Sequence, residues 1–225
     1  ITYTDVVATN MRERLKKYIG KLAYKVNIFT FHALCNEIII NNPEYFAERG
    51  ALTQISDIQK QKILRTILDQ YDREKEKRPL VLFNDKYKYA KEILEQIGIL
   101  KKEDILPEEF LKKSQQLLEE HLMVPKINKK TQRPTVDWQT KTDKLQKMCD
   151  LAEVYQNYSL ELKKNGLYDY DDMILQTIKA LQENEALLAK YQELFQFTLI
   201  DEFQDTNGSQ FKVIELLTSF DNSPN

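Results

Sequence analysis

The 225 residues comprise 42% hydrophobic and 30% charged residues, which is typical of a folded globular protein and excludes a disordered chain. There are 33 basic and 35 acidic residues, so the net charge of −2 neither indicates nor excludes a nucleic-acid partner. No apolar run has bilayer length, no signal peptide is recognisable, and no Cys/His spacing is typical of a metal site. We therefore expect a cytoplasmic protein without membrane contacts, in which Cys35 and Cys149 stay reduced.

Two short strands, each followed by a helix, are predicted in the first 40 residues. Residues 1–3 form the first predicted strand, and helical apolar spacing follows until Gly20, which is well placed to end that helix. Residues 26–29 form the second predicted strand. Thr30 can cap the next helix, which the Asn-Asn-Pro sequence at 41–43 ends.

The middle of the chain is predicted to be helical and carries no strong strand signal. Ser56 or Asp57 caps one helix, a second ends at Gly98, and Pro107 lies in the first turn of a third. Residues 123–138 lack helical periodicity and are predicted to form a long loop. Three further helices are predicted at 145–162, 171–181 and 185–194.

An apolar run at 197–200 ends abruptly in Asp201 and Glu202, and a further helix is predicted at 211–217. Such a run is typical of a buried parallel strand, and acids at its carboxyl end would face the ligand-binding edge of an open sheet. Two adjacent carboxylates point in different directions, so one can hold Mg²⁺ on nucleotide phosphates while the other acts on water. The alternative is a strand that runs into a helix-capping turn, with Asp205, Thr206 or Asn207 as the cap.

These elements predict a protein that is mainly α with a small α/β part. A partial parallel sheet of about three strands would carry a large all-helical insertion. The predicted division places the α/β part at 1–40 and 187–225 and the inserted subdomain at 41–186.

Three blocks of sequence resemble one known family. Asp-Glu-Phe-Gln-Asp-Thr-Asn at 201–207, followed by Gln210, closely resembles the Walker B segment of UvrD/Rep-like superfamily 1 DNA helicases. Residues 1–14 resemble the first DNA-contact motif of that family, and residues 28–35 resemble the next, with its Thr-Phe-His core. A weaker match lies at 168–174. The motifs cover both ends of the chain, whereas the middle matches only in helical character.

The resemblance implies the first RecA-like domain of a helicase with its helical insertion, and it implies roles for single residues. Asp201 would bind Mg²⁺, Glu202 would act on the attacking water, and Gln204 would contact ATP. The implied contacts to single-stranded DNA are Thr2, Tyr3, Thr4, Thr30, Phe31 and His32. The family usually has Asn at the position of Asp5, where an acid would repel phosphate, so we expect Asp5 to serve as a helix cap instead.

Other residues admit two interpretations. The lysines between Lys126 and Lys147, with Trp138 among them, are either a DNA-binding patch or a solvated loop. His121 is expected to be a packed core residue. Tyr168, Tyr170 and the acids around them are expected in subdomain packing and capping. Gln210 either belongs to the motif or lies on a helix surface.

No phosphate-binding loop of the form G-x-x-x-x-G-K-[ST] occurs in these 225 residues. We therefore expect an internal part of a longer parent protein, an ATP-dependent helicase that moves on single-stranded DNA and unwinds duplexes. ATP and Mg²⁺ would bind the parent, while the chain alone would hold neither tightly and would not hydrolyse ATP. The expected partners are single-stranded DNA, its junctions with duplex DNA, and the remaining helicase domains. A subunit of a helicase–nuclease complex and a stand-alone interaction module are the alternatives.

Overall fold

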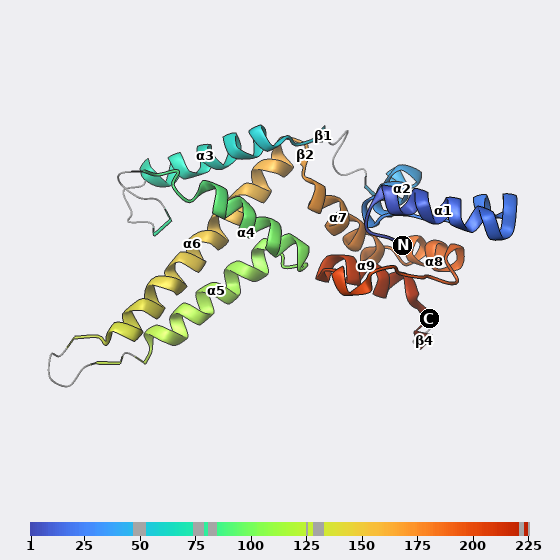
Figure 1. The fold of residues 1–225 in the computed structure, drawn as a ribbon. Coiled ribbons are helices and arrows are strands. Elements are labelled where there is room, and N and C mark those ends of the chain that lie inside the picture. Colours follow the sequence, from blue (N-terminus) through green and yellow to red (C-terminus); the bar gives the residue numbers. More distant parts are fainter. Residues whose placement is uncertain are drawn as a thin grey trace. The chain divides into compact units, whose positions relative to one another are not determined.

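The computed structural model describes residues 1–46, 53–73, 79–80, 85–124, 126–127, 133–220 and 223–224. The chain is mainly helical and divides into two compact units (Figure 1). Unit 1 comprises Ile1–Ala51, Lys101–Asp104 and Asp169–Asn225, and unit 2 comprises Leu52–Leu100 and Ile105–Tyr168. The predicted subdomain boundaries at 40/41 and 186/187 stay a prediction.

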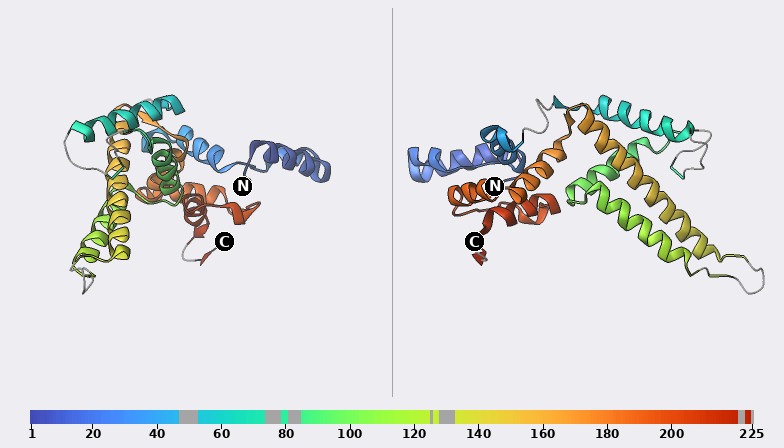
Figure 2. Two further views of the ribbon diagram at one scale, coloured as in Figure 1. Left: turned by 60° about the vertical axis from the view of Figure 1, so that its left-hand side comes forward. Right: turned by 180° about the vertical axis from the view of Figure 1, so that it is seen from behind.

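Unit 2 consists of helices and one very small sheet. Its helices are α3 (Asp57–Arg73), most of α4 (Ala90–Lys102), α5 (Pro107–Leu122) and α6 (Val136–Lys164). The long α5 and α6 lie side by side in all views (Figure 2). The core packs Leu64 and Leu68 of α3 against Ile93 of α4 and Tyr155 of α6. The strand β1 (Thr53–Gln54) pairs in parallel with β2 (Leu167–Tyr168), so the predicted insertion is not all-helical.

Unit 1 brings together helices from both ends of the chain. The first group is α1 (Asp5–Ile19), η1 (Gly20–Lys25), α2 (Phe31–Asn41) and η2 (Pro43–Tyr45). The second is α7 (Tyr170–Glu183), α8 (Glu185–Leu194), η4 (Phe203–Asp205), α9 (Gly208–Thr218), and the antiparallel β3 (Ser219–Phe220) and β4 (Ser223–Pro224). The helix α7 packs against α2, α8 and α9, and its buried Ile174 and Ile178 lie in the core of this unit.

Local signals placed most helix ends correctly. Gly20 ends α1 with a φ of 58°, the Thr30 hydroxyl caps α2, and Pro107 is in the first turn of α5. Three details were wrong. Thr4 and not Asp5 caps α1; α4 continues through Gly98 to Lys102; and α6 starts at Val136, inside the predicted loop. A glycine inside a helix costs only about 1 kcal/mol, which packing of the neighbouring Ile97 offsets.

The predicted three-stranded sheet is not formed, although all three of its segments are described. The segments meet through single contacts: Thr2 forms an isolated parallel bridge with Thr30, and the backbone of Ile1 hydrogen-bonds to Leu199 and Asp201. The prediction of a buried strand at 197–200 was also wrong, since Phe197 is 89% exposed and Leu199 is 84% exposed. A buried parallel strand needs cover on both faces, and the described residues leave these two side chains uncovered.

Candidate functional site

Asp201 lies next to the first residues of the chain. Its backbone N–H donates to the carbonyl of Ile1 at 2.9 Å, and the hydroxyl of Thr2 donates to its Oδ2 atom at 3.4 Å. The backbone N–H of Thr2 in turn donates to the carbonyl of Phe29 at 2.9 Å. Residues 1–2 therefore lie between the segment that carries Asp201 and the segment that leads into Thr30. Three motifs that are far apart in the sequence meet at this point.

Glu202 adopts a left-handed backbone conformation, with φ of 52° and ψ of 47°. This conformation costs a non-glycine residue about 1–2 kcal/mol. Its side chain is exposed, and its carboxylate accepts a hydrogen bond from the Nε2 atom of Gln204, which is exposed as well. Strained backbone of this kind clusters at functional sites.

The end of the Walker B-like segment forms the cap of α9. Asn207 is the cap, since its Oδ1 atom accepts from the backbone N–H of Gln210 at 3.0 Å, and the side chain of Gln210 accepts from the backbone of Asn207. Gln210 is 5% exposed, so the alternative of a helix-surface residue is wrong. Asp205 and Thr206 do not cap this helix.

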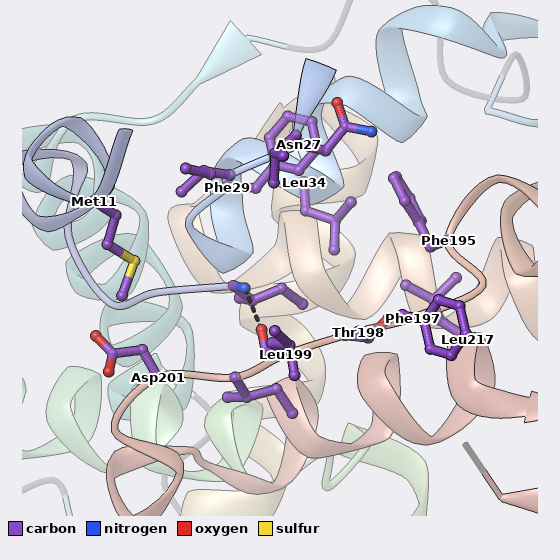
Figure 3. Close-up of a pocket in the computed structure, with 14 residues that line it drawn as sticks. Met11, Asn27, Phe29, Leu34, Phe195, Phe197, Thr198, Leu199, Asp201 and Leu217 are labelled. Carbon is purple, nitrogen blue, oxygen red and sulfur yellow. Dashed lines mark hydrogen bonds between the residues drawn. The ribbon is translucent and has the colours of Figure 1, made fainter. Parts of the chain in front are cut away.

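A mostly apolar pocket of about 370 Å³ lies beside Asp201 (Figure 3). Figure 3 shows Leu34, Phe195, Leu199 and Leu217 around it, with the carboxylate of Asp201 at one end. All of its lining residues belong to unit 1.

The residues that the resemblance assigns to DNA divide into exposed and buried ones. Tyr3 is 57% exposed, and Thr4 is exposed while its hydroxyl accepts from the N–H of Val7. Thr2, Thr30 and Phe31 are 1%, 8% and 4% exposed, respectively. The buried three therefore leave almost no surface that a DNA base could contact.

His32 forms a ring stack that the sequence did not indicate. Its imidazole lies on the ring of Tyr170, with centroids 3.7 Å apart and planes inclined by 23°. The Nε2 atom of His32 has no hydrogen-bond partner among the described residues. Burial lowers the pKa of His32, a backbone hydrogen bond with Tyr170 partly counteracts this, and the nearby Lys102 ammonium lowers the pKa further. His32 is therefore neutral at pH 7.

Tyr170 was not among the predicted DNA contacts. We expected it and the surrounding acids in packing and capping, and this is what they do: Asp169 and Asp172 form the capping box of α7, and Tyr170 packs on His32 while staying 51% exposed. Its position at the start of a helix, inside the acidic-aromatic segment 168–174, was the available signal. The partner ring comes from α2, more than a hundred residues earlier, and no local pattern identifies it.

The resemblance described above implies Mg²⁺ with ATP, so the oxygen donors around Asp201 are compared with what Mg²⁺ needs. Among the described residues no group of three or more His, Cys, Asp or Glu side chains could hold a metal ion. Mg²⁺ bound to nucleotide phosphates needs only one or two protein carboxylates, because water and phosphate oxygens complete its shell. The partly exposed carboxylate of Asp201 fits this mode. The described residues contain no cluster of side chains that would hold a metal ion by themselves.

Unit 2 contains a second pocket, of about 410 Å³, whose lining includes Lys126, Lys141, His121 and Trp138. The rings of His121 and Trp138 stack with centroids 4.9 Å apart, so His121 packs as expected. Residues 128–132 of the lysine-rich stretch lie outside the described residues. The two interpretations of this stretch both stay open.

None of the helices within the described ranges is long and apolar enough to cross a membrane.

Comparison with known proteins identifies the family. The family model described as the UvrD/REP helicase N-terminal domain matches residues 1–223. Similar proteins include "ATP-dependent DNA helicase PcrA" of Leuconostoc citreum, 26% identical over 96% of this chain and 24% of that protein. PcrA of Staphylococcus aureus strain Mu50 is 26% identical over 97% of this chain and 25% of its own length, and a "Probable DNA helicase II homolog" of Mycoplasma capricolum is 25% identical with the same coverage. The chain thus spans about a quarter of the length of these relatives. It belongs to the UvrD/REP helicase N-terminal domain family.

Proposed function

We propose that the chain is the ATP- and DNA-contacting part of an ATP-dependent DNA helicase. The parent protein would couple ATP hydrolysis to movement along single-stranded DNA and to unwinding of duplexes. One observation carries this proposal: the Walker B-like segment at Asp201 and both DNA-contact motifs, at Thr2 and Thr30, join through backbone contacts in one place. A change at the nucleotide would therefore reach the DNA contacts directly.

On the nucleotide side, Asp201 would hold Mg²⁺ and Glu202 would orient and deprotonate the attacking water. The two carboxylates differ in setting. Asp201 accepts from the hydroxyl of Thr2, while Glu202 is exposed and accepts from Gln204. Gln204 would thus keep the Glu202 side chain in one rotamer and contact the nucleotide. Mg²⁺ and ATP, when bound, supply the electrophilic γ-phosphate.

On the DNA side, Tyr3, Thr4 and His32 would contact a single strand, and the exposed ring of Tyr170 adds a stacking surface beside His32. Thr2, Thr30 and Phe31 would hold these residues in place, because they are buried.

The rest of the parent chain would supply the phosphate-binding loop, which the 225 residues do not contain. The chain alone would therefore not hydrolyse ATP. The parent would act on single-stranded DNA and its duplex junctions in the cytoplasm, without a membrane partner.

The test is the ATPase activity of the full-length protein with and without a single-stranded oligonucleotide. Loss of a general base lowers a rate by about 10²–10⁴-fold, so Glu202→Gln should nearly abolish DNA-stimulated turnover. Glu215→Gln is the matched control, since Glu215 is an exposed acid on α9 that pairs with Lys212. A Glu202→Gln protein that hydrolyses ATP as fast as the control would refute the proposed role. Hydrolysis by the 225-residue chain alone, lost in Asp201→Ala, would refute the proposal that it needs the other domains.

A further inference from the structure

Lys101, at the end of α4, is a buried cation with two carboxylate partners. Its side chain is 1% exposed, and its Nζ atom lies 2.7 Å from Oδ2 of Asp169 and 2.7 Å from Oδ1 of Asp172. Lys101 is one of the few residues of α4 that belong to unit 1, so this cluster lies within one unit. The proposed function above gives the cluster no role.

The two carboxylates are the capping box of α7. Oδ1 of Asp169 accepts from the backbone N–H of Asp172 at 3.0 Å, and Oδ2 of Asp172 accepts from the backbone N–H of Asp169 at 2.9 Å. Each carboxylate therefore has one oxygen on the helix backbone and the other on Lys101. In this geometry the ammonium group joins both halves of the cap.

The cap needs this cation because it places two like charges together in a buried setting. Burial opposes ionisation of Asp169, but the ammonium of Lys101 outweighs it and lowers the pKa of Asp169. At Asp172 burial dominates, and its pKa is raised. Burial also opposes the charge on Lys101, but the two carboxylates together raise its pKa, so the lysine stays charged. Without Lys101 the two acids would repel each other, and this repulsion would destabilise the cap.

The turn that carries Lys101 is held on a second side. The N–H of Asp104 donates to the carbonyl of Lys101 at 3.1 Å and closes the turn. A Cβ atom added to Gly208, at the start of α9, would lie only 3.1 Å from Cα of Glu103. Because this turn packs so closely on α9, the position of Lys101 beside the start of α7 is fixed.

Tyr170 lies between the two acids in the sequence and is the first residue of α7. The direction of its side chain depends on the backbone of this first turn, which the capping box sets. We propose that Lys101 is a positioning residue that holds the ring of Tyr170 against His32 by neutralising the two carboxylates of the α7 cap. The link to DNA rests on the proposed function, whereas the link from Lys101 to the ring stack does not.

The chain offers an experiment with an internal control, because it contains two histidines, one in each unit. The Cε1–H resonances of His32 and His121 can be followed by NMR in the 225-residue chain at pH 8, well above the lowered pKa of His32. In Lys101→Met we expect the His32 resonance to lose its ring-current shift and its NOE to Tyr170, while the His121 resonance stays in place. The exposed neighbour Lys102 provides the control variant Lys102→Met, which should keep both signals.

A double variant keeps the test decisive even if the Lys101→Met chain does not fold. Adding Asp172→Asn removes one of the two like charges and keeps an amide oxygen for the backbone of Asp169. The double variant should fold and regain the His32–Tyr170 contact. A folded double variant that still lacks the contact would overturn charge neutralisation as the mechanism. An unchanged His32 resonance in Lys101→Met, or an equal loss in Lys102→Met, would overturn the proposal altogether.

Binding of a labelled oligonucleotide to the full-length protein separates this proposal from the proposed function. Lys101→Met should weaken binding roughly tenfold, as expected for loss of about 1.4 kcal/mol from one base stack. A lost ring contact with unchanged affinity would support the positioning role and refute the DNA contact at this stack. Weaker binding with an intact ring contact would refute the positioning role.

Discussion

The ring of Tyr170 stacks on His32, with 3.7 Å between the ring centroids and 23° between the planes, although the two residues come from different helices that are far apart in the sequence. His32 is partly buried beneath it, and Tyr170 is 51% exposed. The two residues are held in place because their helices, α2 and α7, pack against each other.

Replacing Tyr170 by Ala should weaken binding of single-stranded DNA to the full-length protein by about 5- to 150-fold, since a base–aromatic stack contributes about 1–3 kcal/mol. Tyr170→Phe keeps the ring and should bind like the native protein. Fluorescence anisotropy with a labelled oligonucleotide across a salt series measures both. Equal loss in the two variants would show that the hydroxyl and not the ring face matters.

His32 should titrate below the pKa of 6.5 that is usual for histidine, because burial disfavours its charged form. Lys102→Met should bring its pKa part of the way back, since the ammonium of Lys102 also lowers it. An NMR titration of the Cε1–H resonances reports the pKa directly. A His32 pKa at or above 6.5 in the native chain would contradict this prediction.

The same shift has a consequence for stability. Well above pH 6.5 His32 is neutral in both the folded and the unfolded chain and contributes no pH dependence. As the pH falls from 6.5 towards the lower folded pKa, the unfolded chain binds a proton at His32 that the folded chain does not, so the free energy of unfolding decreases. His32→Gln should lose this part of the slope in urea unfolding experiments between pH 7.5 and 5.5. An identical slope in both proteins would exclude a contribution from His32.

Glu202→Gly should raise the free energy of unfolding relative to Glu202→Ala by up to about 1 kcal/mol. Glycine relieves a left-handed backbone that costs other residues about 1–2 kcal/mol, and its greater freedom in the unfolded chain offsets part of that gain. Both variants lack the carboxylate and should abolish the ATPase activity of the full-length protein. Chemical denaturation measures the difference, and a less stable Gly variant would show that the conformation is not strained.

Gly208→Ala should destabilise unit 1 by about 1–3 kcal/mol, because the new methyl group would clash with the backbone of Glu103. The added Cβ atom would lie 3.0 Å from Oε2, 3.1 Å from Cα and 3.3 Å from the carbonyl carbon of Glu103. Glu103→Ala in the same chain removes only the first of these contacts and should recover a minor part of the loss. Full recovery in that double variant would show that the side chain causes the clash.

Local chemistry made much of unit 1 and unit 2 predictable. Thr30, Pro107 and Gly20 act through their own backbone and their immediate neighbours, so their positions in the sequence were enough to place the ends of three helices. Signals of this kind failed at two places: α4 continues past Gly98, where the neighbouring Ile97 is buried, and α6 begins at Val136, inside the predicted loop. Apolar content predicted a buried strand at 197–200, yet the partners that would cover it are missing from the described residues, and Phe197 and Leu199 lie open.

The sequence by itself determined the family, the helical character and the identity of Asp201 and Glu202 as candidate site residues. It could do so because the residues of a short motif are close together in the sequence, so the pattern can be recognised without the fold. Only the tertiary structure decided which of the candidate DNA contacts are exposed, that Gln210 belongs to a cap, and that Tyr170 lies on His32. The physical reason is that burial and ring contacts depend on residues brought together from distant parts of the chain, as Lys101 and Asp169 also are.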